Sequence, residues 1–499
     1  MDASTRRLSS WAWAIAACVL VVHVATSGRY GWFRDELYFV ACGHHLAWGY
    51  VDQPPLIALM ARIFSIGQSL YLFRLPAALA HAALVLLVAH AARRMGGGAF
   101  AQAMAATATA LAPIFLAFGH LLTMNAFEPL VWLGAALVVL AIVDGADARL
   151  WVLGGAIIGV GLLDKHSVAF FAIALVVGLA ATKQRRLLAT RWFVAAMALA
   201  ALIVLPQVAW QIGHGWPMLE LLRNGRLYKN EPVSPLGFFV GQLELLHPLA
   251  APVWMLGLWQ LLRVPRLRPL GVAALVAAGI VIAGHGKIYY LASLYPLLFA
   301  AGGVAIESLL ERVWSRALAL GVLAAGGLVT LPLALPVLSV PSLLGYQMAL
   351  HFDPPHTERL DYRPLSQIFS DEHGWPELEA AVARVYWSLP PEERRRASLY
   401  THNYGEAGAL DLFGARDGLP PATSGHNAYW MWGPPTGDIV ISVGERKRDL
   451  EKTFDDVREA ARLPPNPWVM PYEDELPVYV SRHPRVPVAE IWPLTRRYD

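Results

Sequence analysis

Charged residues are scarce in this chain. They make up 15% of its 499 residues, whereas hydrophobic residues make up 56%, and the mean hydropathy is +0.44. Soluble domains carry roughly 25% charged residues, so this scarcity excludes an ordinary soluble protein. We therefore predict a polytopic α-helical membrane protein that has room for one additional domain.

Cysteines and nucleotide-binding motifs are also scarce or missing. The chain has only two cysteines, Cys18 in the first apolar segment and Cys42 in the loop after it, so no structural disulfide is expected. The sequence contains no P-loop, no dinucleotide-binding fingerprint and no His-Glu-x-x-His zinc motif. These absences disfavour a soluble nucleotide-driven enzyme or pump. No pattern demands a metal, and we expect no nucleic-acid partner.

Long apolar segments are abundant up to residue 340. A helix needs about 20 apolar residues to cross a bilayer, or fewer where it is short or broken. By this measure residues 1–340 form a transmembrane domain with about eleven spans. The predicted spans are 11–27, 76–92, 99–119, 120–143, 150–163, 167–181, 192–210, 245–262, 270–284, 288–306 and 317–340.

The distribution of basic residues predicts the orientation of these spans. Arginines and lysines gather in alternate short loops, at 93–94, 149, 183–191, 263–268 and 312–316. The positive-inside rule places such loops in the cytoplasm. An odd number of spans then puts the C-terminus outside, on the same side as the long first loop at 28–75.

The composition changes after residue 340, where no apolar segment is long enough to span a membrane. We predict an extracytoplasmic α/β domain at 341–499, with strands at 397–401, 438–443 and 476–481 and helices at 406–413 and 447–461. Several of its aromatic side chains could stack on a sugar, although core packing is the expected role of most of them. They are His402, Tyr404, His426, Trp430 and Trp432.

The loop at 28–75 contains the most distinctive acidic pair in the chain. Asp35 and Glu36 are adjacent and follow the first span closely, among several aromatic residues. A carboxylate beside apolar surroundings is costly unless it has a partner or a task, and an aspartate here could act as a general base toward a hydroxyl or an amine. The alternative is a helix start at the membrane interface, because acids favour the first turn.

A second polar group lies near the outer end of the fourth predicted span. Asn125 and Glu128 are three residues apart and therefore share a helix face. A glutamate within a span normally faces a protein interior or a cavity. The alternative role is a structural contact between helices.

Several cations lie at the outer ends of predicted spans. Lys165 and Lys287 are each the lone lysine of a short turn, and Arg74 ends the first loop. On the same side as Asp35, these cations could hold a phosphate. Each lysine could instead extend its side chain to the interface. Tyr289 and Tyr290 could hold a phosphate oxygen or form part of an aromatic belt.

Four segments resemble one family of enzymes. They are the acidic pair at 35–36, YVDQPPL at 50–56, FRLP at 73–76 and KIYYLASLYP at 287–296. These segments look like the bacterial GT-C membrane glycosyltransferases, and within that class they resemble the protein O-mannosyltransferase and lipid A aminoarabinose transferase group. Residues 400–410 and 424–435 also look like the outer domain of a bacterial subgroup.

The resemblance implies a function and a location. It implies transfer of a sugar from a donor linked to polyprenyl phosphate, usually undecaprenyl phosphate, to a glycan, lipid or protein acceptor. The reaction would take place outside the bacterial cytoplasmic membrane and would invert the anomeric carbon. Some relatives bind a divalent ion, so a metal remains possible on this basis, although nothing in this sequence demands one.

The resemblance also implies roles for particular residues. Asp35 corresponds to the family's catalytic base and Glu36 to its partner. Many members have an aspartate where this chain has Asn125, so either Glu128 serves in its place or neither residue does. The remaining correspondences are the phosphate-binding residues Arg74, Lys165, Lys287, Tyr289 and Tyr290, and Tyr50, Asp52 and Gln53 in a substrate loop.

Two other functions remain open at the level of sequence. A ligase or polymerase could use a lipid-diphosphate donor, although such a donor would need more cations than the sequence provides. A lipid or sugar transporter would need polar residues near mid-membrane and inverted repeats. The polar residues here lie mainly at span ends, and we find no repeat. The sequence does not determine the sugar or the acceptor.

Overall fold

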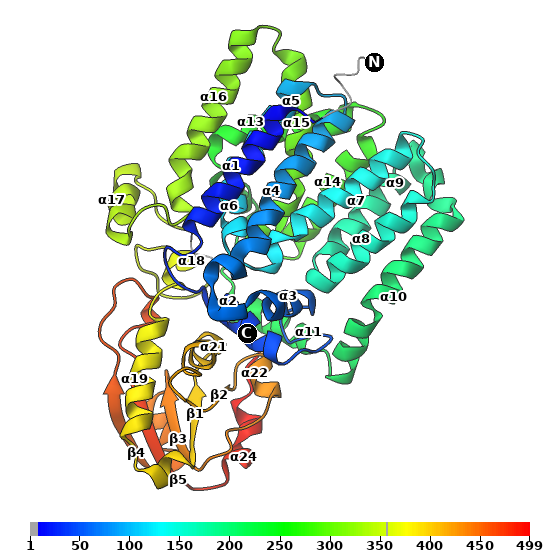
Figure 1. Cartoon of the computed structure of the whole chain (residues 1–499). Helices are drawn as coiled ribbons and strands as arrows, with labels where there is room; N and C mark the ends of the chain where they lie inside the picture. The colour runs from blue at the N-terminus through cyan, green and yellow to red at the C-terminus, as the bar shows by residue number, and fades with distance from the viewer. Residues whose placement is uncertain (1–7, 356–357) are drawn as a thin grey trace. The chain divides into compact units, whose positions relative to one another are not determined.

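The computed structural model describes residues 8–355 and 358–499 (Figure 1). Its internal contacts divide the chain into two compact units. We call the first the helical unit (Met1–Ser27, Arg74–Ala209 and Pro232–Val337) and the second the mixed unit (Gly28–Phe73, Trp210–Glu231 and Leu338–Asp499). This division differs from the predicted domains, because the first loop groups with the C-terminal region.

The described part of the helical unit consists of helices and the short segments that connect them. Its α-helices are α1 (Ser10–Thr26), α4 (Leu70–Arg94), α5 (Ala99–Leu111), α6 (Pro113–His120), α7 (Glu128–Val143), α8 (Leu150–Asp164), α9 (Val168–Ala180), α10 (Arg191–Gly213), α12 (Pro235–Leu246), α13 (Ala251–Arg263), α14 (Arg268–Ala283), α15 (Tyr295–Leu309) and α16 (Val313–Thr330). Its 3₁₀ segments are η3 (Met124–Ala126), η4 (Lys183–Ala189), η6 (Pro248–Ala250), η7 (Ile288–Leu294) and η8 (Leu331–Leu333).

Each predicted span overlaps an apolar helix, but the helices differ in length. Within the described residues, five helical stretches are long and apolar enough to cross a membrane, and the number rises to eight if each sharply bent pair counts as one span. Three more apolar helices, α1, α8 and α14, have 10–17 residues. The total of eleven spans therefore stays a prediction. No span is predicted between residues 210 and 245, whereas the structure has the apolar helix α12 there.

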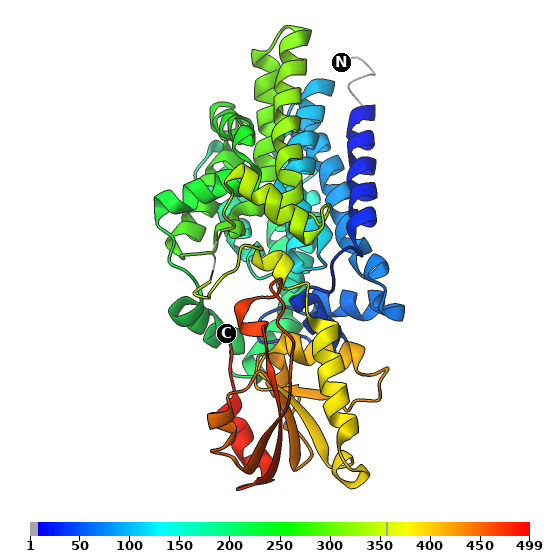
Figure 2. The same cartoon turned by 90° about the vertical axis from the view of Figure 1, so that its left-hand side faces the viewer.

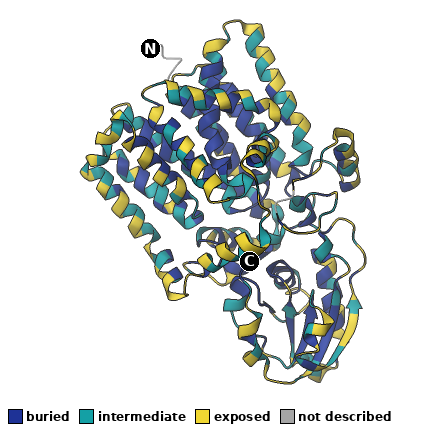
Figure 3. Cartoon of the chain, turned by 180° about the vertical axis from the view of Figure 1, so that it is seen from behind, coloured by how far each residue is buried: buried dark blue, intermediate teal, exposed yellow. Residues whose placement is uncertain are grey.

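Small residues bring the helices of this unit close together. A Cβ atom on Gly257 of α13 would lie 1.9 Å from the Leu298 carbonyl oxygen, and one on Gly302 of α15 would lie 1.9 Å from that of Val253. Helices in lipid associate through such close backbone contact rather than through the hydrophobic effect. Figure 3 shows buried positions concentrated in the inner helices and exposed positions on the outer ones.

The mixed unit combines short helices with one sheet. Its α-helices are α2 (Arg34–His44), α3 (Leu56–Phe64), α11 (Pro217–Asn224), α17 (Val340–Leu350), α18 (Gln367–Ser370), α19 (Trp375–Ser388), α20 (Pro391–Arg394), α21 (Tyr404–Phe413), α22 (Ala428–Met431), α23 (Lys447–Leu450) and α24 (Val488–Ile491). Single turns or irregular helical segments are η2 (Ile66–Gln68), η5 (Gly225–Lys229), η9 (Pro471–Glu473) and η10 (Trp492–Thr495).

The sheet has five strands in the order β2-β1-β3-β5-β4. Its strands are β1 (Ala397–Thr401), β2 (Ala422–Ser424), β3 (Ile439–Val443), β4 (Phe454–Arg462) and β5 (Pro477–Pro484). The first three strands run parallel, whereas β5 is antiparallel to both β3 and β4. Every residue of β3 is buried, as expected of a central strand. Both views show α19 lying along the sheet (Figures 1 and 2).

The predicted α/β character of the C-terminal region is confirmed, with one error in its elements. The three predicted strands correspond to β1, β3 and β5, and the first predicted helix corresponds to α21. The predicted helix at 447–461 is wrong beyond residue 450, because residues 454–462 form the edge strand β4. This strand is polar on most of its length, and its pairing with β5 determines its conformation. Both cysteines are free, as predicted.

We expect Gly257→Ala to destabilise the helical unit. The added methyl group would meet the backbone of α15, and overpacking of this kind costs about 1–3 kcal/mol. Gly279→Ala is the matched control, because Gly279 lies inside α14 with no atom within 4 Å of its added Cβ. Thermal unfolding of the purified variants in detergent should show a lower midpoint for Gly257→Ala and an unchanged midpoint for Gly279→Ala. Equal midpoints would contradict the proposed packing role of Gly257.

Candidate functional site

The acidic pair of the first loop lies in the first turn of α2, where two neighbouring carboxylates have different surroundings. Glu36 is fully buried, and its Oε2 accepts the Phe33 N–H at 3.0 Å. This bond satisfies an N–H group that the helix start leaves without an internal partner. Glu36 therefore caps the helix, and its predicted role as a catalytic partner stays a prediction.

Asp35 has the more accessible carboxylate. About a third of its side chain is exposed (34%), and its Oδ1 accepts a 2.8 Å hydrogen bond from the Tyr404 hydroxyl. Burial raises the pKa of Tyr404 well above its ordinary value, so the hydroxyl remains protonated and can donate. The carboxylate is thus oriented by one donor and still reachable from solvent, which is what a general base requires.

Arg34 anchors this turn of α2 within the mixed unit. Its backbone N–H donates to the Asp371 carbonyl at 3.0 Å, and its Nη1 donates to the Tyr472 hydroxyl at 2.5 Å. Its Nε lies 3.7 Å from a carboxylate oxygen of Asp371 and 3.8 Å from Oδ1 of Asp35. A largely buried guanidinium with several partners holds the backbone beside Asp35 in a defined position.

A second carboxylate of the first loop, Asp52, lies close to the same aromatic cluster. The Tyr38 hydroxyl donates to its Oδ1 at 2.9 Å, and the Tyr38 ring lies 4.7 Å from that of Tyr404. Burial raises the pKa of Asp52 to about 7, and the neighbouring charge of Asp35 adds to this effect. Near neutral pH, Asp52 can therefore exchange a proton.

The other two residues predicted in the substrate loop are buried. The Tyr50 hydroxyl lies 3.0 Å from the Cys42 carbonyl, and its backbone oxygen accepts a hydrogen bond from Gln211 at 3.0 Å. Gln53 is fully buried and donates to the Cys42 sulfur at 3.4 Å. These contacts stabilise the loop, so the geometry supports a structural role for both side chains. Contact with a substrate stays a prediction.

Several of the predicted residues of the helical unit form one cluster. The Lys165 ammonium donates to Asn125 Oδ1 at 2.7 Å and to Glu128 Oε2 at 2.8 Å. Ser167 donates to the other oxygen of Glu128 at 2.5 Å. Glu128 is almost completely buried, and the ion pair compensates its charge. Asn125 and Glu128 thus both accept hydrogen bonds from Lys165, and a catalytic role for either one stays a prediction.

The predicted tyrosines contact the same lysine. The ammonium of Lys165 lies 5.8 Å from the ring centre of Tyr289 and 5.4 Å from that of Tyr290, within the range of cation–π attraction. Lys287 is two residues before Tyr289, immediately before η7, and is half-buried. The motif at 287–290 therefore meets the Lys165 cluster within one unit. Phosphate binding by these residues stays a prediction.

Arg74 differs from the other predicted cations because it is fully buried. Its Nη1 donates to the Ser27 carbonyl at 3.0 Å and contacts His120 Nε2 at 3.0 Å. These bonds connect the ends of α1 and α6 to α4. A phosphate would have to displace them to reach the guanidinium, so the geometry favours a structural role, and phosphate binding by Arg74 stays a prediction.

Sequence reasoning missed the partners that orient these groups. Asp371, Tyr472 and Ser167 were not singled out, and Tyr404 was named only as a possible sugar platform. Their contacts join residues far apart in the chain, which no spacing in the sequence reveals. Over residues 8–355 and 358–499, no three His, Cys, Asp or Glu side chains gather as potential metal ligands.

Comparisons with known proteins agree with this architecture. Residues 52–210 match the family model described as dolichyl-phosphate-mannose-protein mannosyltransferase. ArnT from Cupriavidus metallidurans, bound to undecaprenyl phosphate, aligns with a TM-score of 0.61 at 17% identity over 95% of this chain and 98% of that chain. The chain has the fold of a GT-C glycosyltransferase. The resemblance inferred from its motifs is confirmed.

Two further structures extend this GT-C comparison. ArnT in the apo state aligns with a TM-score of 0.60 at 17% identity, over 94% of this chain and 97% of that chain. The archaeal oligosaccharyltransferase AglB from Archaeoglobus fulgidus, in complex with an inhibitory peptide and a dolichol-phosphate, aligns with a TM-score of 0.52 at 12% identity, over 87% and 70%. A comparison with curated protein sequences gives no match.

We expect the Lys165–Glu128 pair of this chain to behave as one structural unit. Glu128→Gln or Lys165→Met alone leaves a buried polar partner uncompensated, which costs about 3–5 kcal/mol. The double variant should recover much of that loss, because neither charge remains. Thermal unfolding midpoints of the four proteins measure the coupling. Additive losses would show that the two groups act independently.

We expect Asp52 to make stability fall as pH rises. In the unfolded chain this carboxyl loses its proton near its ordinary pKa of 3.8, whereas in the folded protein it keeps the proton to about pH 7. The folded state therefore binds more protons between these values, and its stability declines across that range. Asp52→Asn should flatten the decline in unfolding midpoints measured from pH 5 to pH 8. Asp455→Asn, at an exposed position, should leave the decline unchanged.

Proposed function

We propose that this chain is a membrane glycosyltransferase that moves a sugar from a polyprenyl phosphate to an acceptor hydroxyl or amine, with inversion at the anomeric carbon. The observation that carries the proposal is Asp35, a partly exposed carboxylate oriented by Tyr404 in a chain with the GT-C fold. The reaction would take place on the outer face of the bacterial cytoplasmic membrane, with the C-terminal region also outside.

Two observations support a polyprenyl phosphate donor. ArnT was determined with undecaprenyl phosphate bound, and AglB with a dolichol-phosphate. Both share the fold of this chain at low sequence identity. The matched family model is that of transferases that use a dolichyl-phosphate-linked mannose. A lipid carrier is also available to an enzyme whose apolar helices could cross the bilayer.

In the proposed reaction Asp35 acts on the acceptor. Its carboxylate removes a proton from the acceptor hydroxyl or amine while that group attacks C1 of the sugar. The bond between C1 and the phosphate oxygen breaks, and polyprenyl phosphate leaves. The Tyr404 hydroxyl and Arg34 hold the carboxylate for this step. We propose that Asp52, with its pKa raised to about 7, receives or relays protons rather than serving as the primary base.

We propose that the segment at 287–290 binds the donor phosphate. Lys287 would supply positive charge to the leaving phosphate, and the hydroxyl groups of Tyr289 and Tyr290 would donate to its oxygens. Lys165 supports these rings from one side while its own charge is compensated by Glu128. In this assignment Lys165, Glu128 and Asn125 position the tyrosines.

We expect Asp35→Asn to reduce donor consumption by about 100-fold or more, because the amide cannot accept the acceptor proton. Purified protein is reconstituted with a cell-envelope lipid extract as acceptor. It then receives a panel of radiolabelled undecaprenyl phosphate sugars that includes mannose, aminoarabinose and galacturonic acid. Loss of label from the donor measures turnover and identifies the sugar. Asp455→Asn, with the same chemical change at an exposed site, should retain full activity.

The alternatives give different results in the same assay. A ligase or polymerase would consume only lipid-diphosphate donors, and a transporter would move the labelled lipid between leaflets without releasing its sugar. Undiminished consumption by Asp35→Asn would show that Asp35 is not the base. Failure of the wild-type protein to consume any monophosphate donor would overturn the proposed function as a whole.

A further inference from the structure

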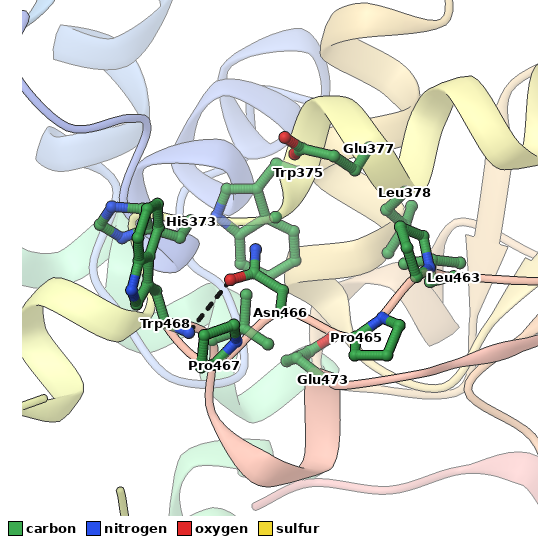
Figure 4. A pocket seen from close by; sticks show the side chains of 13 residues that line it. His373, Trp375, Glu377, Leu378, Leu463, Pro465, Asn466, Pro467, Trp468 and Glu473 are labelled. Atoms are coloured by element: carbon green, nitrogen blue, oxygen red, sulfur yellow. Dashed lines mark hydrogen bonds between the residues drawn. The ribbon is translucent and has the colours of Figure 1, made fainter. Parts of the chain in front are cut away.

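A cavity of about 390 Å³ lies within the mixed unit, between the start of α19 and the segment that leads from β4 to η9 (Figure 4). Its volume is within the range of small-molecule sites, roughly 300–1,000 Å³. Prolines and leucines form part of its wall. The residues that carry the argument below are His373, Trp375, Glu377, Asn466, Trp468 and Glu473.

One buried carboxyl group of this cavity lacks a complete set of partners. Glu473 is 92% buried, and its Oε1 accepts a hydrogen bond from Asn403 at 2.8 Å. Its Oε2 is buried and has no hydrogen-bond partner among the described residues. A buried polar atom without a partner costs free energy unless a ligand or a solvent molecule satisfies it. Burial also raises the pKa of Glu473, which favours a neutral carboxyl that can donate a hydrogen bond.

Aromatic and amide groups complete the wall. Trp468 is 39% exposed and lies 6.0 Å from the His373 ring, whereas Trp375 is buried and its indole N–H donates to the Asp371 carbonyl. The Asn466 side-chain oxygen accepts the backbone N–H of Trp468 at 3.0 Å, so its amide NH₂ remains as a donor (Figure 4). The cavity therefore combines a flat apolar face with polar groups that can both donate and accept.

We propose that this cavity binds a carbohydrate, one or two pyranose units of a neutral sugar or an amino sugar. The apolar face of the sugar ring would pack on Trp468, and its hydroxyl groups would bond to Glu473 and Asn466. This goes beyond the proposed transfer reaction, because binding here requires neither the lipid-linked donor nor Asp35. Sugars are the class of ligand that presents an apolar ring face and several hydroxyl groups at once.

Two other ligand classes fit the cavity less well. A phosphate or a carboxylate would meet the acidic side chain of Glu377 without a compensating cation, because neither lysine nor arginine is among the described lining residues. A lipid chain would leave the Glu473 carboxyl and the Asn466 amide without hydrogen bonds, which is costly in a buried site. A ligand rich in hydroxyl groups avoids both penalties.

Saturation-transfer NMR on the full-length protein tests the proposal. The protein is placed in lipid nanodiscs without maltoside detergent, because a sugar-based detergent would compete. The probes are methyl α-D-mannopyranoside, D-glucosamine and cellobiose, with D-galacturonate as the anionic comparison, and no lipid-linked donor is added. We expect transfer to at least one of the first three and little to D-galacturonate. Transfer to none of the three, or equal transfer to D-galacturonate, would overturn the proposal.

Substitutions then locate the binding site. Trp468→Ala should weaken binding by roughly three- to tenfold through loss of the stacking face, whereas Trp387→Ala, at an exposed tryptophan outside the cavity, should not. Glu473→Leu should also weaken binding, and Glu473→Gln, which keeps the hydrogen-bonding shape, should retain it. Unchanged binding by both Trp468→Ala and Glu473→Leu would contradict the site. Because no donor is present, these results are independent of the transferase assay.

Discussion

The buried guanidinium of Arg34 is the constraint on which the geometry of Asp35 depends. Its partners Asp371 and Tyr472 come from the C-terminal region of the sequence, more than 300 positions away. A buried cation must be compensated, and removal of one partner from such a contact is costly. Because Arg34 occupies the first position of α2, its compensation also fixes the direction in which that helix begins. The chemistry proposed for the first loop is therefore built jointly by both ends of the chain.

The helical unit depends on a different physical constraint, which is how helices pack against each other in lipid. Helices in lipid gain little from burying apolar surface, so close packing depends on small residues such as Gly257 and Gly302. Polar side chains are tolerated when they satisfy each other, as Lys165, Glu128 and Asn125 do. The compensated lysine can then approach Tyr289 and Tyr290 without a net charge on the cluster. We regard this arrangement as support for the tyrosines rather than as a phosphate site in itself.

Much of this architecture could be predicted from the sequence because its signals are local. Apolar length identified the helices, a buried β-branched pattern identified β3, and motif spacing identified Asp35 and the segment at 287–290. The sequence signal for β4 was misleading, because a polar edge strand takes its conformation from its neighbour β5. Arg74 shows that the sequence alone does not determine the role of a single charged residue. A lone arginine at the end of a span can hold a ligand or support a helix, and only its contacts with Ser27 and His120 show which role the geometry favours.

The contrast between Asp35 and Glu36 shows how two adjacent acidic side chains can have different surroundings and different roles. Successive residues of an α-helix point about 100° apart, so one carboxylate can turn back to cap the helix while the other faces outward. Glu36 takes the first role and is fully buried, which leaves Asp35 as the more accessible carboxylate of the pair. The Tyr404 that orients Asp35 directly follows Asn403, which bonds Glu473 in the proposed sugar cavity. Glu473 and Asp35 are thus hydrogen-bonded to two consecutive residues at the start of α21.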